Sequence, residues 1–144
     1  MFVIDTNILI YAANQRSLGH EPCRRLLSEW RSRTEPWYLT WGIIYEFLRV
    51  STHPRVFTKP LSIGNAWAFL NAAIASPAAG VLQETQRHQE LFNEVAAEVP
   101  GLAGNLVFDA HTAVLMREHG IRRIYTHDTN FRHFPFLEVV DPLQ

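Results

Sequence analysis

The chain has 144 residues, a formal net charge of −1 and 47% hydrophobic residues. This length suits a single domain over residues 1–144, and a chain of this size buries roughly two thirds of its unfolded surface, so its core needs no disulfide or metal. The near-neutral charge excludes a strongly basic nucleic-acid-binding protein, and any phosphate-binding surface must be a local patch.

Short apolar runs rich in β-forming residues alternate with longer stretches whose apolar residues recur at spacings of three and four. Proline and glycine separate them, and Gly120 suits the left-handed position that ends a helix. In chain order, the expected elements are a strand at 2–4, helices at 8–13 and 17–33, a strand at 37–40, helices at 43–52 and 62–75, a strand at 81–82, helices at 87–99 and 106–119, and strands at 123–126 and 137–140. This alternation predicts an α/β fold with a mainly parallel central sheet of four to five strands and helices on both faces.

Three of the expected helices carry apolar stripes, and on helix 17–33 the stripe is Leu26, Leu27 and Trp30. The stripe on helix 62–75 is bulky enough to be either core or a groove for a partner helix. The expected inward-facing residues are Ile63, Trp67, Leu70 and Ile74 on helix 62–75, and Leu91, Phe92, Val95 and Val99 on helix 87–99.

The sequence also indicates where the protein resides. Its single cysteine, Cys23, cannot form an internal disulfide. The chain opens directly into Phe2-Val3-Ile4 without a basic leader, and no apolar run approaches the ~18 residues that cross a bilayer. We therefore expect a cytoplasmic protein without a membrane partner.

Among the thirteen basic residues, only Lys59 is a lysine. Arginine grips phosphate with two hydrogen bonds, so this bias weakly favours a phosphate-rich partner. The arginine clusters at 24–33 and 117–123 could contact phosphates, but solvated helix faces explain them equally well.

Three of the four aspartates occupy the ends of expected elements. Asp5 follows the first strand, Asp128 follows the strand at 123–126, and Asp109 lies in the first turn of helix 106–119. In an open parallel sheet, ligands bind where the carboxyl ends of the strands converge. Glu46 lies on helix 43–52 among apolar residues, where a charge either faces solvent or is held inward with a partner.

Clustered carboxylates repel one another, and a bound cation relieves the repulsion. Their hard oxygen atoms suit Mg²⁺ or Mn²⁺, which can position water, lower its pKa and neutralise charge on a phosphate. Asp5, Glu46, Asp109 and Asp128 are thus the candidate catalytic residues of a metal-dependent nuclease.

Each aspartate alone has a simpler explanation. Asp5 could be only a helix N-cap, Asp109 a first-turn acid favoured by the helix dipole, and Asp128 a turn former. Their joint pattern favours the functional interpretation. The expected supporting groups around them are Thr6, Asn7, Thr126 and Asn130. His111 and His127 are expected to face away from the site.

Four segments in order resemble the PIN-domain family, in particular the VapC toxin ribonucleases of bacterial toxin–antitoxin pairs. The opening Phe2–Leu9 resembles the start of these domains, and the helix that carries Glu46 resembles their second acidic motif. The segment Gly104–Ala110 resembles the third motif, and Thr126–Phe131 resembles the fourth.

The resemblance implies a Mg²⁺-dependent endoribonuclease, with Mn²⁺ as a substitute. It also implies a homodimer and a small antitoxin whose C-terminal segment lies across the site. Asp5 and Asp109 would be the main metal ligands, and Asp128 and Glu46 would complete the site. Many family members carry aspartate where this chain has Asn130, and the loss of that charge leaves open whether one or two ions bind.

Two other functions fit acids at strand ends. An aspartyl-phosphate phosphotransferase would use Asp5 as nucleophile, but such enzymes need a second aspartate two residues on, where Asn7 stands, or a lysine near the phosphate. A non-catalytic RNA-binding domain on the same fold usually lacks some of the acids that are present here.

Overall fold

Five short strands form the central sheet in the computed structural model, which describes residues 1–144. All neighbouring pairs are parallel, and their order across the sheet is β3-β2-β1-β4-β5. The strands are β1 (Phe2–Ile4), β2 (Trp37–Thr40), β3 (Ala79–Leu82), β4 (Arg123–Tyr125) and β5 (Glu138–Val140). The predicted α/β class with a mainly parallel sheet is confirmed.

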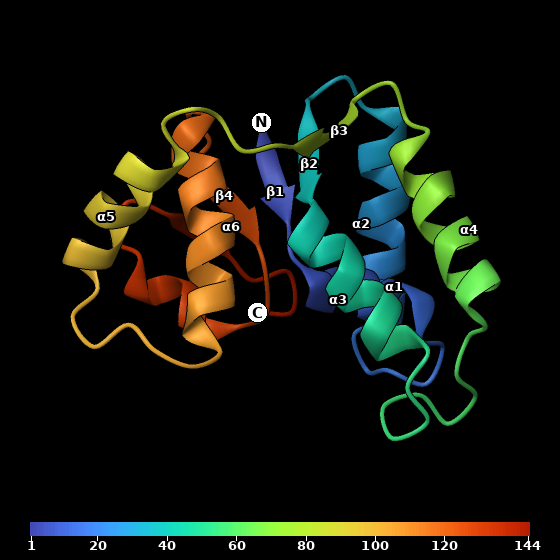
Figure 1. The fold of residues 1–144 in the computed structure, drawn as a ribbon. Coiled ribbons are helices and arrows are strands. Elements are labelled where there is room, and N and C mark those ends of the chain that lie inside the picture. Colours follow the sequence, from blue (N-terminus) through green and yellow to red (C-terminus); the bar gives the residue numbers. More distant parts are fainter.

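Six α-helices and one short 3₁₀-helix, η1, connect the strands. Helices α1 to α4 gather beside β1, β2 and β3, whereas α5 and α6 pack together beside β4, so the sheet is flanked by helices on both sides (Figure 1). The helices are α1 (Thr6–Ala13), α2 (His20–Ser32), α3 (Trp41–Ser51), α4 (Ile63–Ile74), α5 (His88–Glu98), α6 (Leu106–Glu118) and η1 (Thr129–His133). None of them is long and apolar enough to span a bilayer.

The strand order reverses beside β1. The first three strands follow one another outward from β1, and the chain then returns through α5 and α6 to place β4 on the other side of β1. In parallel sheets, a reversal of this kind leaves a crevice at the carboxyl ends of the two neighbouring strands. Asp5 directly follows β1, and Thr126 directly follows β4.

The side chains of β1 are buried at 0–1% exposure. The ring of Phe2 lies 5.1 Å from Trp30 and 4.9 Å from Tyr125, which fixes α2 and β4 against the central strand. Because β1 and its neighbours are held rigidly, the residues that follow them have defined positions.

The first three helices begin at other residues than predicted. Helix α1 begins at Thr6 instead of Ile8, because Asp5 caps it. Helix α2 begins at His20 because Ser17 instead forms a local turn, in which its hydroxyl accepts a hydrogen bond from the Gly19 N–H at 3.1 Å. Helix α3 begins at Trp41 because Thr40, the last residue of β2, caps it directly by accepting from Ile43 N–H at 3.1 Å. The 3₁₀-helix η1 was not predicted.

Two predicted inward faces are wrong in part. Helix α4 packs through the small-residue face of Ala66, Leu70 and Ala73. Small side chains allow close approach to α3, and this rotates Ile63 and Trp67 outward, to 64% and 38% exposure. On α5, Leu91 and Val95 are buried as predicted, but Phe92 is 38% exposed.

Gly120 ends α6 with a φ of +68°, as predicted. Nothing lies within 4 Å of a Cβ built at this position, so substitution would cost only backbone strain. We expect Gly120→Ala to lower the free energy of unfolding by about 1 kcal/mol. Gly64→Ala, in the exposed first turn of α4, is the matched control and should raise it by up to about 1 kcal/mol. Equal effects of the two variants in urea unfolding would contradict this explanation.

Candidate functional site

Asp5 lies at the carboxyl end of β1 and is only 7% exposed. Its Oδ1 accepts a hydrogen bond from the Thr6 N–H at 2.7 Å, which makes it the N-cap of α1. Its Oδ2 accepts from the Asn7 amide at 2.8 Å and from the Thr126 hydroxyl at 2.7 Å. Three donors therefore fix the orientation of one buried carboxylate, and its capping role is compatible with a role in the site.

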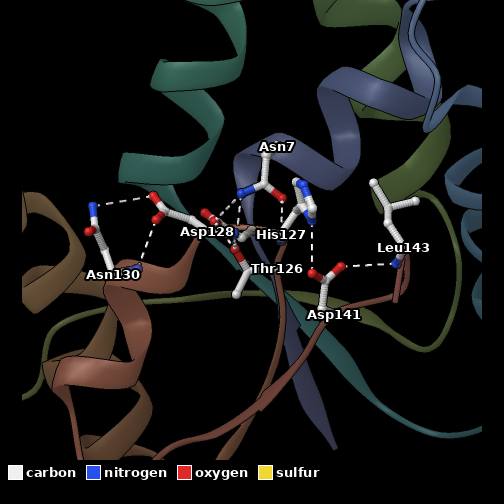
Figure 2. Close-up of polar contacts among 8 residues, drawn as sticks. Asn7, Thr126, His127, Asp128, Asn130, Asp141 and Leu143 are labelled. Atoms are coloured by element: carbon white, nitrogen blue, oxygen red, sulfur yellow. Dashed lines mark hydrogen bonds and ion pairs between the residues drawn. The ribbon is translucent and has the colours of Figure 1, made fainter.

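Thr126 and Asn7 connect the ends of β1 and β4 (Figure 2). The Thr126 hydroxyl donates to Asp5 and accepts from the Asn7 amide and from the Asp128 N–H, each at 2.9 Å. The Asn7 Oδ1 accepts from the His127 N–H at 3.0 Å. These bonds use all three hydrogen-bonding positions of the buried hydroxyl, so they hold the two strand ends in one arrangement.

Glu46 reaches the site from the second turn of α3. Its Oε2 accepts a hydrogen bond from the Thr6 hydroxyl at 2.8 Å, which ties α3 to the start of α1. Arg49, one turn further along, approaches Oε1 only to 3.9 Å. The Glu46 side chain remains 51% exposed. Thr6 thus positions a carboxylate that is still open to solvent.

Asp128 and Asp109 come from the other half of the chain. Asp128 caps η1, since its Oδ1 accepts from the Asn130 N–H at 2.8 Å, and the Asn130 amide lies 3.5 Å from its Oδ2. Asp109 is half-buried in the first turn of α6. Asn130 therefore positions Asp128 and adds no negative charge to the site.

The four acids line one cavity. A space of about 270 Å³ is bounded by Asp5, Glu46, Asp109 and Asp128 together with Thr6 and Asn7. An adjoining space of about 290 Å³ shares the first three of these acids. The structure therefore brings together four side chains that are separated by up to 123 positions in the sequence (128 − 5).

Burial and mutual repulsion disfavour ionisation of two of these acids. Burial raises the pKa of Asp5 to about 6, hydrogen bonds from Thr126 and Thr6 oppose the rise, and the Glu46 and Asp128 carboxylates add to it. Burial raises the pKa of Asp109 to about 7, with further contributions from Asp5, Asp128 and Glu46, and the nearby Asn130 partly offsets them. Near neutral pH the cavity concentrates negative charge that a cation would stabilise.

The donor set fits a hard divalent cation, because every acidic ligand offers oxygen. However, no three acidic, histidine or cysteine side chains are spaced so that they would enclose an ion directly. An ion here would need water among its ligands or small side-chain movements, as is usual for Mg²⁺, which retains several waters.

The two histidines close to the acids in sequence, His111 and His127, point in different directions. His127 faces away, as predicted, and its Nδ1 lies 2.8 Å from Asp141 Oδ2, on the opposite side of Asn7 from Asp128 (Figure 2). The prediction for His111 is wrong, because its side chain lines the cavity that adjoins Asp109. Lys59 lines a different cavity, so no lysine borders the acids.

Sequence reasoning did not identify four residues that border the acids: Tyr45, Arg49, Phe108 and His111. Their signal was present, because each lies within three positions of Glu46 or Asp109. By contrast, the arginines at 24, 33, 117 and 123 pair with glutamates elsewhere. Arg49 is the one arginine that borders the acidic cavities.

A parallel α/β sheet with converging carboxylates at its topological switch point defines a protein that binds its ligand at the carboxyl edge of the sheet. The family model described as PIN domain matches residues 2–137. The chain therefore belongs to the PIN-domain family.

Its curated relatives include two proteins of Mycobacterium tuberculosis. Ribonuclease VapC48 is 32% identical over 138 residues, covering 96% of this chain and 94% of the relative. Ribonuclease VapC43 is 34% identical over 143 residues, covering 99% and 96%.

Solved structures share the fold. VapBC2 from Rickettsia felis, bound to a promoter DNA fragment, has a TM-score of 0.69 at 14% identity and 96% coverage of both chains. Mycobacterium tuberculosis VapC20, described as a Sarcin-Ricin loop cleaving toxin, has a TM-score of 0.66 at 20% identity, covering 92% of this chain and 93% of that one.

Proposed function

We propose that this protein is a divalent-metal-dependent endoribonuclease, the VapC-type toxin of a toxin–antitoxin pair. The observation that carries the proposal is the shared cavity of Asp5, Glu46, Asp109 and Asp128. The near-full-length similarity to proteins named ribonucleases supports RNA as the substrate. The oxygen-only acidic set supports Mg²⁺, with Mn²⁺ as a substitute.

Asp5, Asp109 and Asp128 would hold the ion. When bound, it would supply Lewis acidity at the phosphate and lower the pKa of water. Thr126 and Asn7 keep the Asp5 carboxylate in one orientation. Glu46 accepts from Thr6 through Oε2, so its Oε1 is left to accept a proton from the attacking water.

The same comparisons support one of the proposed partners, an antitoxin. Several neighbours in fold are VapBC complexes, including one from nontypeable Haemophilus influenzae, and this supports a small antitoxin that covers the site. A homodimer in the cytoplasm completes the proposal. In this arrangement, the antitoxin would place a cationic or hydrogen-bonding group against the four acids.

The test is RNA cleavage by the purified chain in millimolar Mg²⁺. We expect products with 5′-phosphate and 3′-hydroxyl ends, no cleavage in EDTA, and a melting temperature that Mg²⁺ raises at pH 8, since a ligand at 100 times its Kd stabilises by about 2.7 kcal/mol. An Asp5→Asn preparation purified in parallel controls for contaminating nucleases.

Three results would count against the proposal. Cleavage that persists in EDTA would exclude metal dependence. Products with 2′,3′-cyclic phosphate ends would show attack by the RNA's own hydroxyl instead of water. RNA binding without turnover in any divalent ion would favour a non-catalytic domain.

A further inference from the structure

The acidic cavity adjoins a second space. Both spaces share Asp5, Glu46 and Asp109, and the second extends between α3 and α6. Its volume of about 290 Å³ is at the lower end of the range that holds small organic ligands. A phosphate at the acids would therefore place the adjacent nucleotide of the same strand in this second space.

Two aromatic rings border this space and are unusually exposed. Phe108 is 77% exposed and Tyr45 is 68% exposed. The Trp41 and Tyr45 rings pack together in a tilted pair with centroids 6.3 Å apart. Side chains of this size are usually buried, so aromatic faces left in solvent beside a charged site indicate a ligand.

Two cationic or hydrogen-bonding side chains, Arg49 and His111, line the same space as the rings and the acids. The Arg49 guanidinium contacts only Glu46, at 3.9 Å, and is 69% exposed, so this weak pair leaves it available to a phosphate. The His111 Nε2 is held by Glu84 Oε1 at 2.9 Å. A Cβ at position 42 would lie 3.4 Å from His111 Nδ1, so Gly42 keeps this edge of the ring accessible.

This combination fits a nucleotide better than an apolar protein surface. An apolar protein face would bury Arg49 and three carboxylates without partners, which is unfavourable. A nucleotide supplies an aromatic base for the rings and a phosphate for the guanidinium. Only an unpaired base offers its faces for stacking, because bases in a duplex are already stacked and paired.

We propose that Tyr45, Arg49, Phe108 and His111 form a subsite for one unpaired nucleotide next to the scissile phosphate. The subsite rests on the proposed ribonuclease function. The base stacks on the exposed rings, and Arg49 contacts its phosphate.

The test measures RNA binding by the full chain with Asp109→Asn, which prevents cleavage, using fluorescence anisotropy of an end-labelled RNA. Adding Tyr45→Ala and Phe108→Ala together should weaken binding of single-stranded RNA by about 10-fold or more. Binding of a duplex of the same sequence should be weak and unchanged. Tyr45→Phe, which keeps the ring, should retain affinity, and Trp67→Ala, an exposed aromatic of α4 outside the cavity, is the matched control.

The subsite would be overturned if the double-alanine variant bound single-stranded RNA as tightly as the Asp109→Asn protein that keeps both rings. A change of its oligomeric state in size-exclusion chromatography with unchanged RNA affinity would also overturn it, and would identify the rings as a protein interface. In the chain that retains Asp109, the Tyr45→Ala and Phe108→Ala substitutions together should also lower kcat/KM for RNA cleavage. They should leave the Mg²⁺-induced rise in melting temperature unchanged. Absence of cleavage by the unmodified chain would instead refute the proposed function, and the two failures are thereby distinguished.

Discussion

Replacing Asp109 with asparagine should lower the rate of RNA cleavage at least about 100-fold and, at the same time, stabilise the metal-free protein at pH 8. The two effects have one cause. The pKa of Asp109 is raised from 3.8 to about 7 by burial and by three other carboxylates, so the folded protein holds this proton more tightly than the unfolded chain does. Stability therefore falls as pH rises from about 4 to about 7 and stays reduced above that range.

Asparagine has nearly the same shape as aspartate and no charge, so it removes the free-energy cost of ionising residue 109 in the folded protein. Because Asp109 is partly exposed and solvent screens it, we expect a gain of about 2 kcal/mol at pH 8, which corresponds to a melting temperature higher by roughly 5 °C or more. The measurement is thermal unfolding in EDTA at a series of pH values. The difference between variant and unmodified protein should narrow as pH is lowered towards 4.

Asp141→Asn provides the control. Asp141 is also partly buried, but it pairs with His127 at 2.8 Å and accepts from the Leu143 N–H at 2.9 Å, on the far side of Asn7 from Asp128 (Figure 2). Its replacement should destabilise the protein and leave cleavage intact. If Asp109→Asn lowered stability at pH 8, the carboxylate would be held by favourable contacts, and the explanation by charge repulsion would be wrong.

The sequence predicted the strands and the positions of the aspartates well, because both depend on local signals. The apolar run at Phe2–Ile4 favours a buried strand of a parallel sheet, and Asp5 then falls at its carboxyl end. Convergence with Asp128 follows because β4 lies beside β1. These features needed no knowledge of side-chain packing.

Features that depend on helix rotation could not be predicted in the same way. Which face of α4 turns inward depends on Ala66 and Ala73, whose small side chains allow close packing that periodicity alone does not reveal. His111 was expected to face away, but α6 packs so that this side chain meets Glu84. The aromatic and cationic wall of the cavity was missed for the same reason, since exposure is a property of the packed helices.

Thr126→Val should reduce both stability and cleavage, because one hydroxyl that is fully buried connects three polar groups. Valine has a similar shape but leaves Asp5 Oδ2 with one donor fewer, and it removes the acceptor for the Asn7 amide and the Asp128 N–H. We expect a loss of about 2–3 kcal/mol in the free energy of unfolding, measured in urea, since buried polar groups would lose their partners. Cleavage should fall about 10-fold or more as the Asp5 carboxylate loses its fixed orientation.

The pH dependence of cleavage distinguishes positioning of Asp5 from a purely structural role of Thr126. The hydrogen bond from Thr126 is the strongest influence that lowers the pKa of Asp5, so its removal should raise that pKa above about 6 and shift the acidic limb of the cleavage profile to higher pH. Thr126→Ser, which keeps the hydroxyl, should restore most of the rate. Thr52→Val, which removes only local bonds to the Leu48 and Arg49 carbonyls at the end of α3, should leave the profile unchanged. A Thr126→Val protein that is destabilised but keeps the original profile would show that the hydroxyl holds the strand ends together without influencing ionisation of the carboxylate.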